Sequence, residues 1–248
     1  MRTTLCRLVG VLVILGGLFT MTASAQDFQN SYTLGPGGRI NIRVTSGTVT
    51  IVGYDGEAVI VKGFKDGRDR DVVKIEDLSS PNSVDVRDRY PKVCKCEVDV
   101  RFEVQVPRSV FLRFDKVVTV SGDIEMRDVT GELNALAMSG TVFIKGVRGS
   151  IDARSMSGAV VAEISNPEAI RDMKCTTMSG NVHVKLKGSL DANVELLSSS
   201  GRIETDFPTK IRSDNYRPRY RVQSKVGTGS GSIRLESRSG NVSLTKLR

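Results

Sequence analysis

The chain has no tryptophan, and phenylalanine and tyrosine together supply only 5% of its 248 residues. Nucleic-acid binding typically combines clustered basic residues with aromatic side chains that stack on bases. The single histidine, His183, excludes any site built from several imidazoles. These shortages argue against nucleic acid as a partner and against histidine-based metal centres.

A long hydrophobic run is also missing, because the longest apolar stretch covers residues 8–19 and is interrupted by glycines. A membrane-spanning helix needs about 20 apolar residues. Arg2 and Arg7 precede this stretch, and the small residues Ala23, Ser24 and Ala25 follow it. This order is typical of a secretory signal peptide, here residues 1–25, and predicts an extracytoplasmic protein in the periplasm, in the medium or at the cell surface, without a transmembrane span after cleavage.

The charge is mildly basic and mixed in sign. The formal net charge is +8 for the whole chain, of which Arg2 and Arg7 contribute two. Such a balance suits association with anionic envelope components better than with nucleic acid. We therefore expect an envelope protein, an anionic polymer or a lipid head group as the partner, and no cofactor.

Glycine recurs every nine residues in the second half of the chain. Internal periodicity of this kind is typical of repeat architectures. The regular spacing runs over five glycines, continues less regularly over three more, and returns in a final pair: Gly122, Gly131, Gly140, Gly149 and Gly158; Gly180, Gly188 and Gly201; Gly231 and Gly240.

Apolar residues keep a constant offset from these glycines. The second residue after each glycine is aliphatic, and the fourth is apolar with the single exception of Thr205. Period-two alternation over short segments predicts half-buried strands. Because one such unit cannot bury its apolar face alone, the units must stack. The sequence therefore predicts an all-β fold, namely a single-chain β-solenoid that resembles a β-helix and is built from short Ser-Gly-led strands. A sandwich of meandering strands is the alternative.

Every second corner of this solenoid carries serine before glycine. With two strands per rung, these serines form a ladder: Ser121, Ser139, Ser157, Ser179 and Ser200. Three methionines precede them, Met138, Met156 and Met178. We predict that these methionines fill the core, since methionine adapts to irregular gaps; a ligand-facing stripe is the alternative.

The mature chain divides into an N-terminal β region, residues 26–120, and a β-solenoid region, residues 121–248, which we expect to be continuous as one domain. Alternation predicts strands at 39–44, 48–52, 58–62 and 98–106 in the first region. Residues 65–92 are typical of a hairpin with long polar loops. Within the repeats, Asn166, Pro167 and Glu168 predict a short helical turn.

A basic insertion interrupts the repeats between Phe207 and Gly227. Arginine and tyrosine favour interfaces, so the segment is a candidate docking loop for an anionic surface, the alternative being a solvated irregular loop. The candidate partner-binding residues are Lys210, Arg212, Tyr216, Arg217, Arg219, Tyr220 and Arg221.

We assign no catalytic or metal-binding residue. His183 lies at an outward-facing position of its unit, which does not favour a serine triad. Four carboxylates could share an outer face as in β-solenoid glycosidases, although solvated charges are the simpler interpretation: Asp123, Glu125, Glu132 and Asp152.

Three cysteines remain after residue 25, and the state of two of them is open. Cys94 and Cys96 could form a disulfide, bind a metal or be two small residues on one strand face. Residues two apart on a strand lie roughly 6.5 to 7 Å from each other, near the upper limit for bridging. The pairing of Cys175 is also open, because an odd number leaves one thiol over.

The order of several motifs resembles the bacterial putative adhesin family, domain of unknown function 4097. These motifs are Val52-Gly53-Tyr54-Asp55 followed by Val59-Ile60-Val61, then Phe102-Glu103-Val104-Gln105-Val106-Pro107, and repeated Met-Ser-Gly or Ser-Ser-Gly leads. The resemblance extends from Thr33 to Leu247. It implies an exported solenoid-like β protein without established catalytic residues.

The function we expect is a non-enzymatic structural or adhesin-like interaction module of the bacterial cell envelope. The alternative is an envelope-stress sensing or regulatory protein that binds a membrane partner, and a carbohydrate-active β-helix enzyme is a third.

Overall fold

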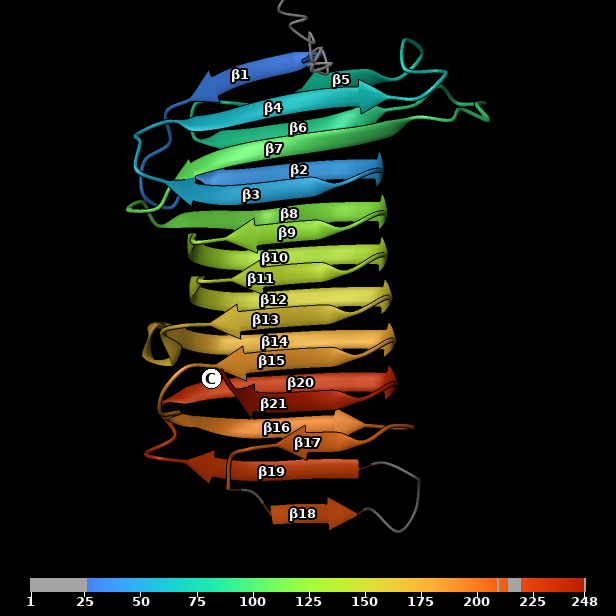
Figure 1. Ribbon diagram of the computed structural model, residues 1–248. Helices are drawn as coiled ribbons and strands as arrows, with labels where there is room; N and C mark the ends of the chain where they lie inside the picture. Colours follow the sequence, from blue (N-terminus) through green and yellow to red (C-terminus); the bar gives the residue numbers. More distant parts are fainter. Residues whose placement is uncertain (1–25, 209, 214–219, 248) are drawn as a thin grey trace, which may run out of the picture.

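The protein is a stack of strands in two facing sheets (Figure 1). The computed structural model describes residues 26–208, 210–213 and 220–247, so the expected signal peptide lies outside the described residues. The predicted all-β solenoid is confirmed. Within the described ranges, no helix is long and apolar enough to cross a membrane.

The two sheets have ten and eleven strands. In the ten-stranded sheet the spatial order is β1 (Phe28–Tyr32), β4 (Val59–Asp66), β7 (Asp99–Pro107), β3 (Val49–Tyr54), β9 (Ile124–Arg127), β11 (Val142–Lys145), β13 (Val160–Ile164), β15 (Val182–Leu186), β21 (Val242–Lys246) and β17 (Ile203–Thr205). In the eleven-stranded sheet it is β18 (Lys210–Ser213), β19 (Tyr220–Val226), β16 (Ala192–Ser198), β20 (Gly231–Ser239), β14 (Ile170–Ser179), β12 (Arg148–Ser157), β10 (Thr130–Ser139), β8 (Leu112–Ser121), β2 (Arg39–Ser46), β6 (Ser83–Arg89) and β5 (Lys74–Asp77).

Each rung of the solenoid consists of one strand from each sheet. Neighbouring rungs pair in parallel, so that Leu133 lies opposite Ile151 and Val142 lies opposite Val160. Two nine-residue units therefore make one rung, as the glycine spacing predicts. The predicted helical turn is also present, as the 3-10 helix Pro167–Ala169 between β13 and β14.

The core lies between the sheets and consists of the apolar positions that follow each glycine. Ile144 and Ile151, at offsets four and two, are 1% and 2% exposed. Burying one such side chain contributes about 1.5–3 kcal/mol to folding. Ile203, in the short strand β17, is only partly buried.

The N-terminal region continues the same two sheets. Strand β2 pairs in parallel with β8, and β3 pairs in parallel with β9. The chain then leaves the regular rungs: β4 runs antiparallel to β7, and β5 and β6 form the predicted hairpin within residues 65–92. The strands expected in this region are present with small shifts of their ends.

The last rung of the chain is not the last rung of the stack, which corrects the predicted serine ladder. Strand β20 lies between β14 and β16, so Ser179 pairs with Ser239 rather than with Ser200 (Figure 1). The ladder shown by the strand pairing is therefore Ser46, Ser121, Ser139, Ser157, Ser179 and Ser239. Gly201, which follows Ser200, stacks on the next corner, Gly240. Any two rungs of the same length can pair with each other, so the glycine spacing alone did not specify the order of the rungs in the stack.

The prediction that Met138, Met156 and Met178 fill the core is wrong. Their exposed fractions are 41%, 43% and 45%. The physical reason is the strand period of two, because Met138 lies seven residues after Gly131, an odd offset that places it on the outer face. The inward residue before it is Ala137, which is fully buried.

Buried hydroxyl groups stabilise the corners from the inside. Ser155 donates to the carbonyl oxygen of Gly140 at 2.9 Å, and Thr177 donates to that of Gly158 at 2.8 Å. Both hydroxyl groups thus reach the glycine of the preceding rung. In each case a buried hydroxyl donor and a buried carbonyl acceptor satisfy each other's hydrogen-bonding capacity. These hydroxyl groups belong to residues two positions before the Ser-Gly serines Ser157 and Ser179.

The corner glycines form a column in which backbones touch. A Cβ atom on Gly158 would lie 2.2 Å from the carbonyl oxygen of Gly140, and one on Gly180 would lie 2.2 Å from that of Gly158. The φ angle of Gly158 is +148°, which side chains disfavour. The recurrence of glycine at these corners therefore follows from close stacking as well as from backbone conformation.

Candidate functional site

The basic insertion extends the eleven-stranded sheet beyond the last rung. Its described parts are strands rather than an irregular loop, because β19 pairs antiparallel with β16 and β18 pairs antiparallel with β19. Tyr216, Arg217 and Arg219 lie outside the described residues. For Lys210 and Arg212 the structure describes the strand but not the side chains.

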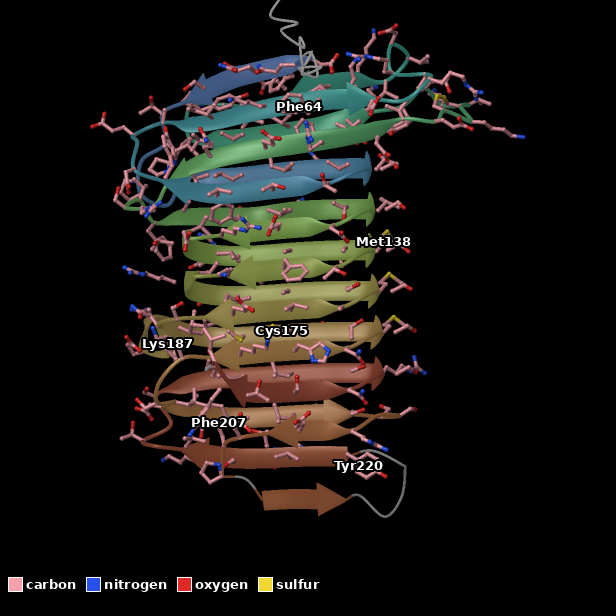
Figure 2. The ribbon with its side chains drawn as sticks, viewed as in Figure 1. Phe64, Met138, Cys175, Lys187, Phe207 and Tyr220 are labelled. Atoms are coloured by element: carbon pink, nitrogen blue, oxygen red, sulfur yellow. A yellow bond between two sulfur atoms is a disulfide. The ribbon has the colours of Figure 1, made fainter. Side chains whose placement is uncertain are left out.

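The two remaining candidates, Tyr220 and Arg221, begin strand β19 and have different environments. Tyr220 is exposed at the end of the stack (Figure 2). Arg221 forms an ion pair with Glu195, which also accepts a hydrogen bond from Arg234 at 2.7 Å. Arg221 is thus paired within the protein but remains exposed, and Tyr220 is exposed without such a pairing in its described surroundings.

An open hollow of about 550 Å³ lies beside this ion-pair network on the outer face of β16, β19 and β20. Asn193, Gln223, Lys225 and Arg234 are among the residues that line it. Hydrogen bonding to Glu236 raises the pKa of the Arg234 guanidinium. The lining is polar and charged, so this surface suits polar ligands rather than apolar ones.

The four candidate carboxylates do not all lie on one sheet. Glu125 lies on β9 in one sheet, whereas Glu132 and Asp152 lie on β10 and β12 in the other. Each has a local partner: Glu125 pairs with Arg127, Glu132 with Arg113 and Asp152 with Arg154. The Asp123 carboxylate accepts a hydrogen bond from the backbone N–H of Thr141. Such local pairing agrees with the simpler interpretation of these residues as solvated surface charges.

His183 lies on the outer face of β15, as predicted. Its Nδ1 atom is 2.7 Å from the hydroxyl oxygen of Ser243 on the neighbouring strand β21. Glu204 on β17 lies opposite Ser243 on the other side of β21. The order across the three strands is therefore His183, Ser243 and Glu204, with the serine between the histidine and the acid. In a serine triad the acid orients the histidine from the side away from the serine. The order along this row is therefore not that of a triad.

An exposed methionine row is the surface feature that sequence reasoning missed. Met138, Met156 and Met178 project from the edge at which the long strands end, and Met138 is seen there in Figure 2. Val120, which is 44% exposed, precedes them on β8. The odd offset from the corner glycine was the available signal, because it places all such residues outside the core.

Cys94 and Cys96 form a disulfide, with a Cα–Cα distance of 5.2 Å. Of the three interpretations left open, the first is thus the observed one. The strand argument against it does not apply, because both residues lie in the connection between β6 and β7. Cys175 is a free and fully buried thiol, and this burial raises its pKa to about 12.

Thiol counting should reproduce this arrangement. Only the thiolate reacts with disulfide reagents, so buried Cys175 should be unreactive towards Ellman's reagent in the native protein at pH 8. In denaturant, the chain from Gln26 onward should show one reactive thiol per protein. After prior reduction of the disulfide it should show three. Three equivalents without reduction would contradict the disulfide, and rapid reaction of the native protein would contradict the burial of Cys175.

Comparison with known proteins identifies one family. A profile described as Toastrack DUF4097 matches residues 103–245, which is more than half of the chain. The earlier motif at Val52–Asp55 lies outside the matched residues. No curated protein is similar in sequence.

Solved structures also match this chain, at low similarity. A putative cell adhesion protein from Clostridium sporogenes is 11% identical, with 89% of this chain and 99% of that chain covered and a TM-score of 0.46. A putative adhesin from Bacteroides fragilis is 15% identical, with 89% and 96% covered and a TM-score of 0.35. A putative lipid binding protein from Parabacteroides distasonis is 13% identical, with 89% and 96% covered and a TM-score of 0.24. These scores are low, so the assignment depends on the profile match.

The matched residues include most rungs of the two-sheet solenoid and the Met-Ser-Gly corners that repeat along it. The resemblance to the domain of unknown function 4097 family is thereby confirmed, and the chain belongs to the Toastrack DUF4097 family.

Proposed function

We propose that the protein is an extracytoplasmic, adhesin-like interaction module of the bacterial cell envelope that binds its partner without turnover. The observation that carries this proposal is the extension of the eleven-stranded sheet by β19 and β18 at one end of the stack. In the sequence, an arginine-rich segment connects these two strands, and the strands themselves lie at one end of a regularly stacked body. The signal-peptide pattern of residues 1–25 supports export.

The proposed partner is an anionic component of the envelope, such as an acidic polymer, a lipid head group or an acidic protein surface. Arginine pairs with phosphate and carboxylate groups in a bidentate geometry, which lysine does not reproduce. Arg217 and Arg219 contribute to the positive charge of the segment, and the exposed ring of Tyr220, the next residue in the sequence, adds contact area. Such contacts position a partner and require no catalytic group.

Charge reversal tests the proposal. The variant R217E/R219E/R221E should lose at least nine-tenths of its recovery of envelope material in a crosslinking pull-down from the native envelope fraction, because repulsion replaces attraction. R221E also breaks the ion pair with Glu195, so a second variant, R217E/R219E, should show most of the loss.

A matched control changes the same charge elsewhere. Arg148, Arg171 and Lys187 are exposed on the described rungs, away from β18 and β19. R148E/R171E/K187E alters the net charge equally and should retain binding. If both triple variants lose the same recovery of envelope material, net charge alone explains the binding and the docking proposal is wrong. Unchanged recovery with R217E/R219E would also overturn the docking proposal.

A further inference from the structure

Three thioether groups are stacked on consecutive rungs of the solenoid. The residues on either side of Met138 pair in register with those around Met156, and the residues around Met156 pair in register with those around Met178. Neighbouring strands are about 4.8 Å apart. The three side chains therefore start from one line on the outer surface, at about 4.8 Å intervals.

The fold does not require methionine at this position. The equivalent residue is Thr45 on β2, Val120 on β8 and Arg238 on β20. The position thus accepts a hydroxyl, a branched aliphatic and a charged side chain. The chain has seven methionines in 248 residues, and Met126 and Met173 are buried. Core packing explains those two but not a row of three on the surface.

The chemistry common to the row is that of a soft, neutral sulfur donor. Soft sulfur ligands bind Cu(I), zinc and iron–sulfur clusters, and of these Cu(I) is the ion that neutral thioether groups suit without a thiolate. With a metal–sulfur bond of about 2.3 Å, two sulfurs on opposite sides of one ion lie about 4.6 Å apart, close to the rung spacing. Methionine has three rotatable bonds, so the third side chain can turn towards the same ion.

We propose that Met138, Met156 and Met178 form a surface site for Cu(I), held by two or three thioether sulfurs from neighbouring rungs. Exposure of 41–45% lets the ion enter without opening the fold. Thioether sulfur carries no proton in the physiological range, so affinity for Cu(I) is the same at pH 5 and at pH 8. This site is separate from the basic segment and does not depend on the proposed docking function.

Methyl NMR with Ag(I), a redox-inert substitute for Cu(I), tests the proposal directly. In protein labelled with ¹³C at the methionine methyl groups, the signals of Met138, Met156 and Met178 should shift together and saturate near one ion per protein. Met126 and Met173 are internal controls, because both are buried and should not move. Unmoved signals of the exposed three would overturn the site.

A matched variant separates metal binding from apolar contact. M138L/M156L/M178L keeps the size and apolar character of the row and removes its sulfur. Competition with a chromogenic Cu(I) chelator should show at least tenfold weaker binding in this variant, with an unchanged melting temperature. Equal affinity for Cu(I) in the wild type and the variant would overturn the site. A tenfold loss of wild-type affinity for Cu(I) from pH 8 to pH 5 would also overturn it, because it would indicate a thiol or imidazole ligand. Retained pull-down of the envelope partner would confirm that the two surfaces act separately.

Discussion

Replacing Ile144 with aspartate is expected to unfold most of the protein at 37 °C. Ile144 is 1% exposed on β11, between a rung above and a rung below. The substitution loses about 1.5–3 kcal/mol of aliphatic burial. Burying the unpaired carboxylate costs several kcal/mol more, or the group takes up a proton instead. The sum is comparable with the whole stability of a typical domain, about 5–15 kcal/mol.

The neighbouring residue Phe143 provides the control, because it faces solvent from the same strand and is 46% exposed. F143D should change the free energy of unfolding by much less, since it buries no charge. Urea denaturation followed by circular dichroism measures both variants. An unchanged midpoint for I144D, or an equal loss for F143D, would contradict the assignment of inner and outer faces.

Replacing Gly158 with alanine is expected to destabilise the protein by about 2–6 kcal/mol, from ~1–3 kcal/mol of backbone strain and ~1–3 kcal/mol of overpacking. The strain arises because φ is +148°. The overpacking arises because the new Cβ would lie 2.2 Å from the carbonyl oxygen of Gly140, which is fixed in the adjacent rung. Backbone atoms cannot rotate away as a side chain can, so the two rungs must separate locally.

Two other glycines separate these causes. Gly188 has φ of +89° with nothing within 4 Å of an added Cβ, so G188A carries backbone strain alone. Gly35 has open space and no positive φ, so G35A should be neutral or slightly stabilising. Melting temperatures measured by calorimetry should fall in the order G35A, G188A, G158A. A G158A protein as stable as G188A would show that contact between rungs adds nothing.

The site could be foreseen only in part. The outward position of His183 followed from counting residues along its strand. The expectation for Met138 was wrong because apolar character was given more weight than the odd offset from Gly131. The ion pair between Arg221 and Glu195 was not predictable, because Glu195 lies 26 residues earlier and meets Arg221 only through the β16–β19 pairing.

By itself, the sequence determined the shape of one rung. The nine-residue glycine spacing and the apolar second and fourth positions specify two short strands and two corners, because these depend on local conformation and on side-chain alternation. They also specify which residues, such as Ile144 and Ile151, must be buried once rungs stack.

Only the tertiary structure decided which rungs are neighbours. Strand β20 lies between β14 and β16, although about thirty residues separate its start from the end of β16. Parallel strands of equal period present the same backbone groups to any partner, so the pattern contains little information about order. The choice is made by long-range contacts, including the antiparallel pairing of β19 with the free edge of β16, which leaves the other edge to β20.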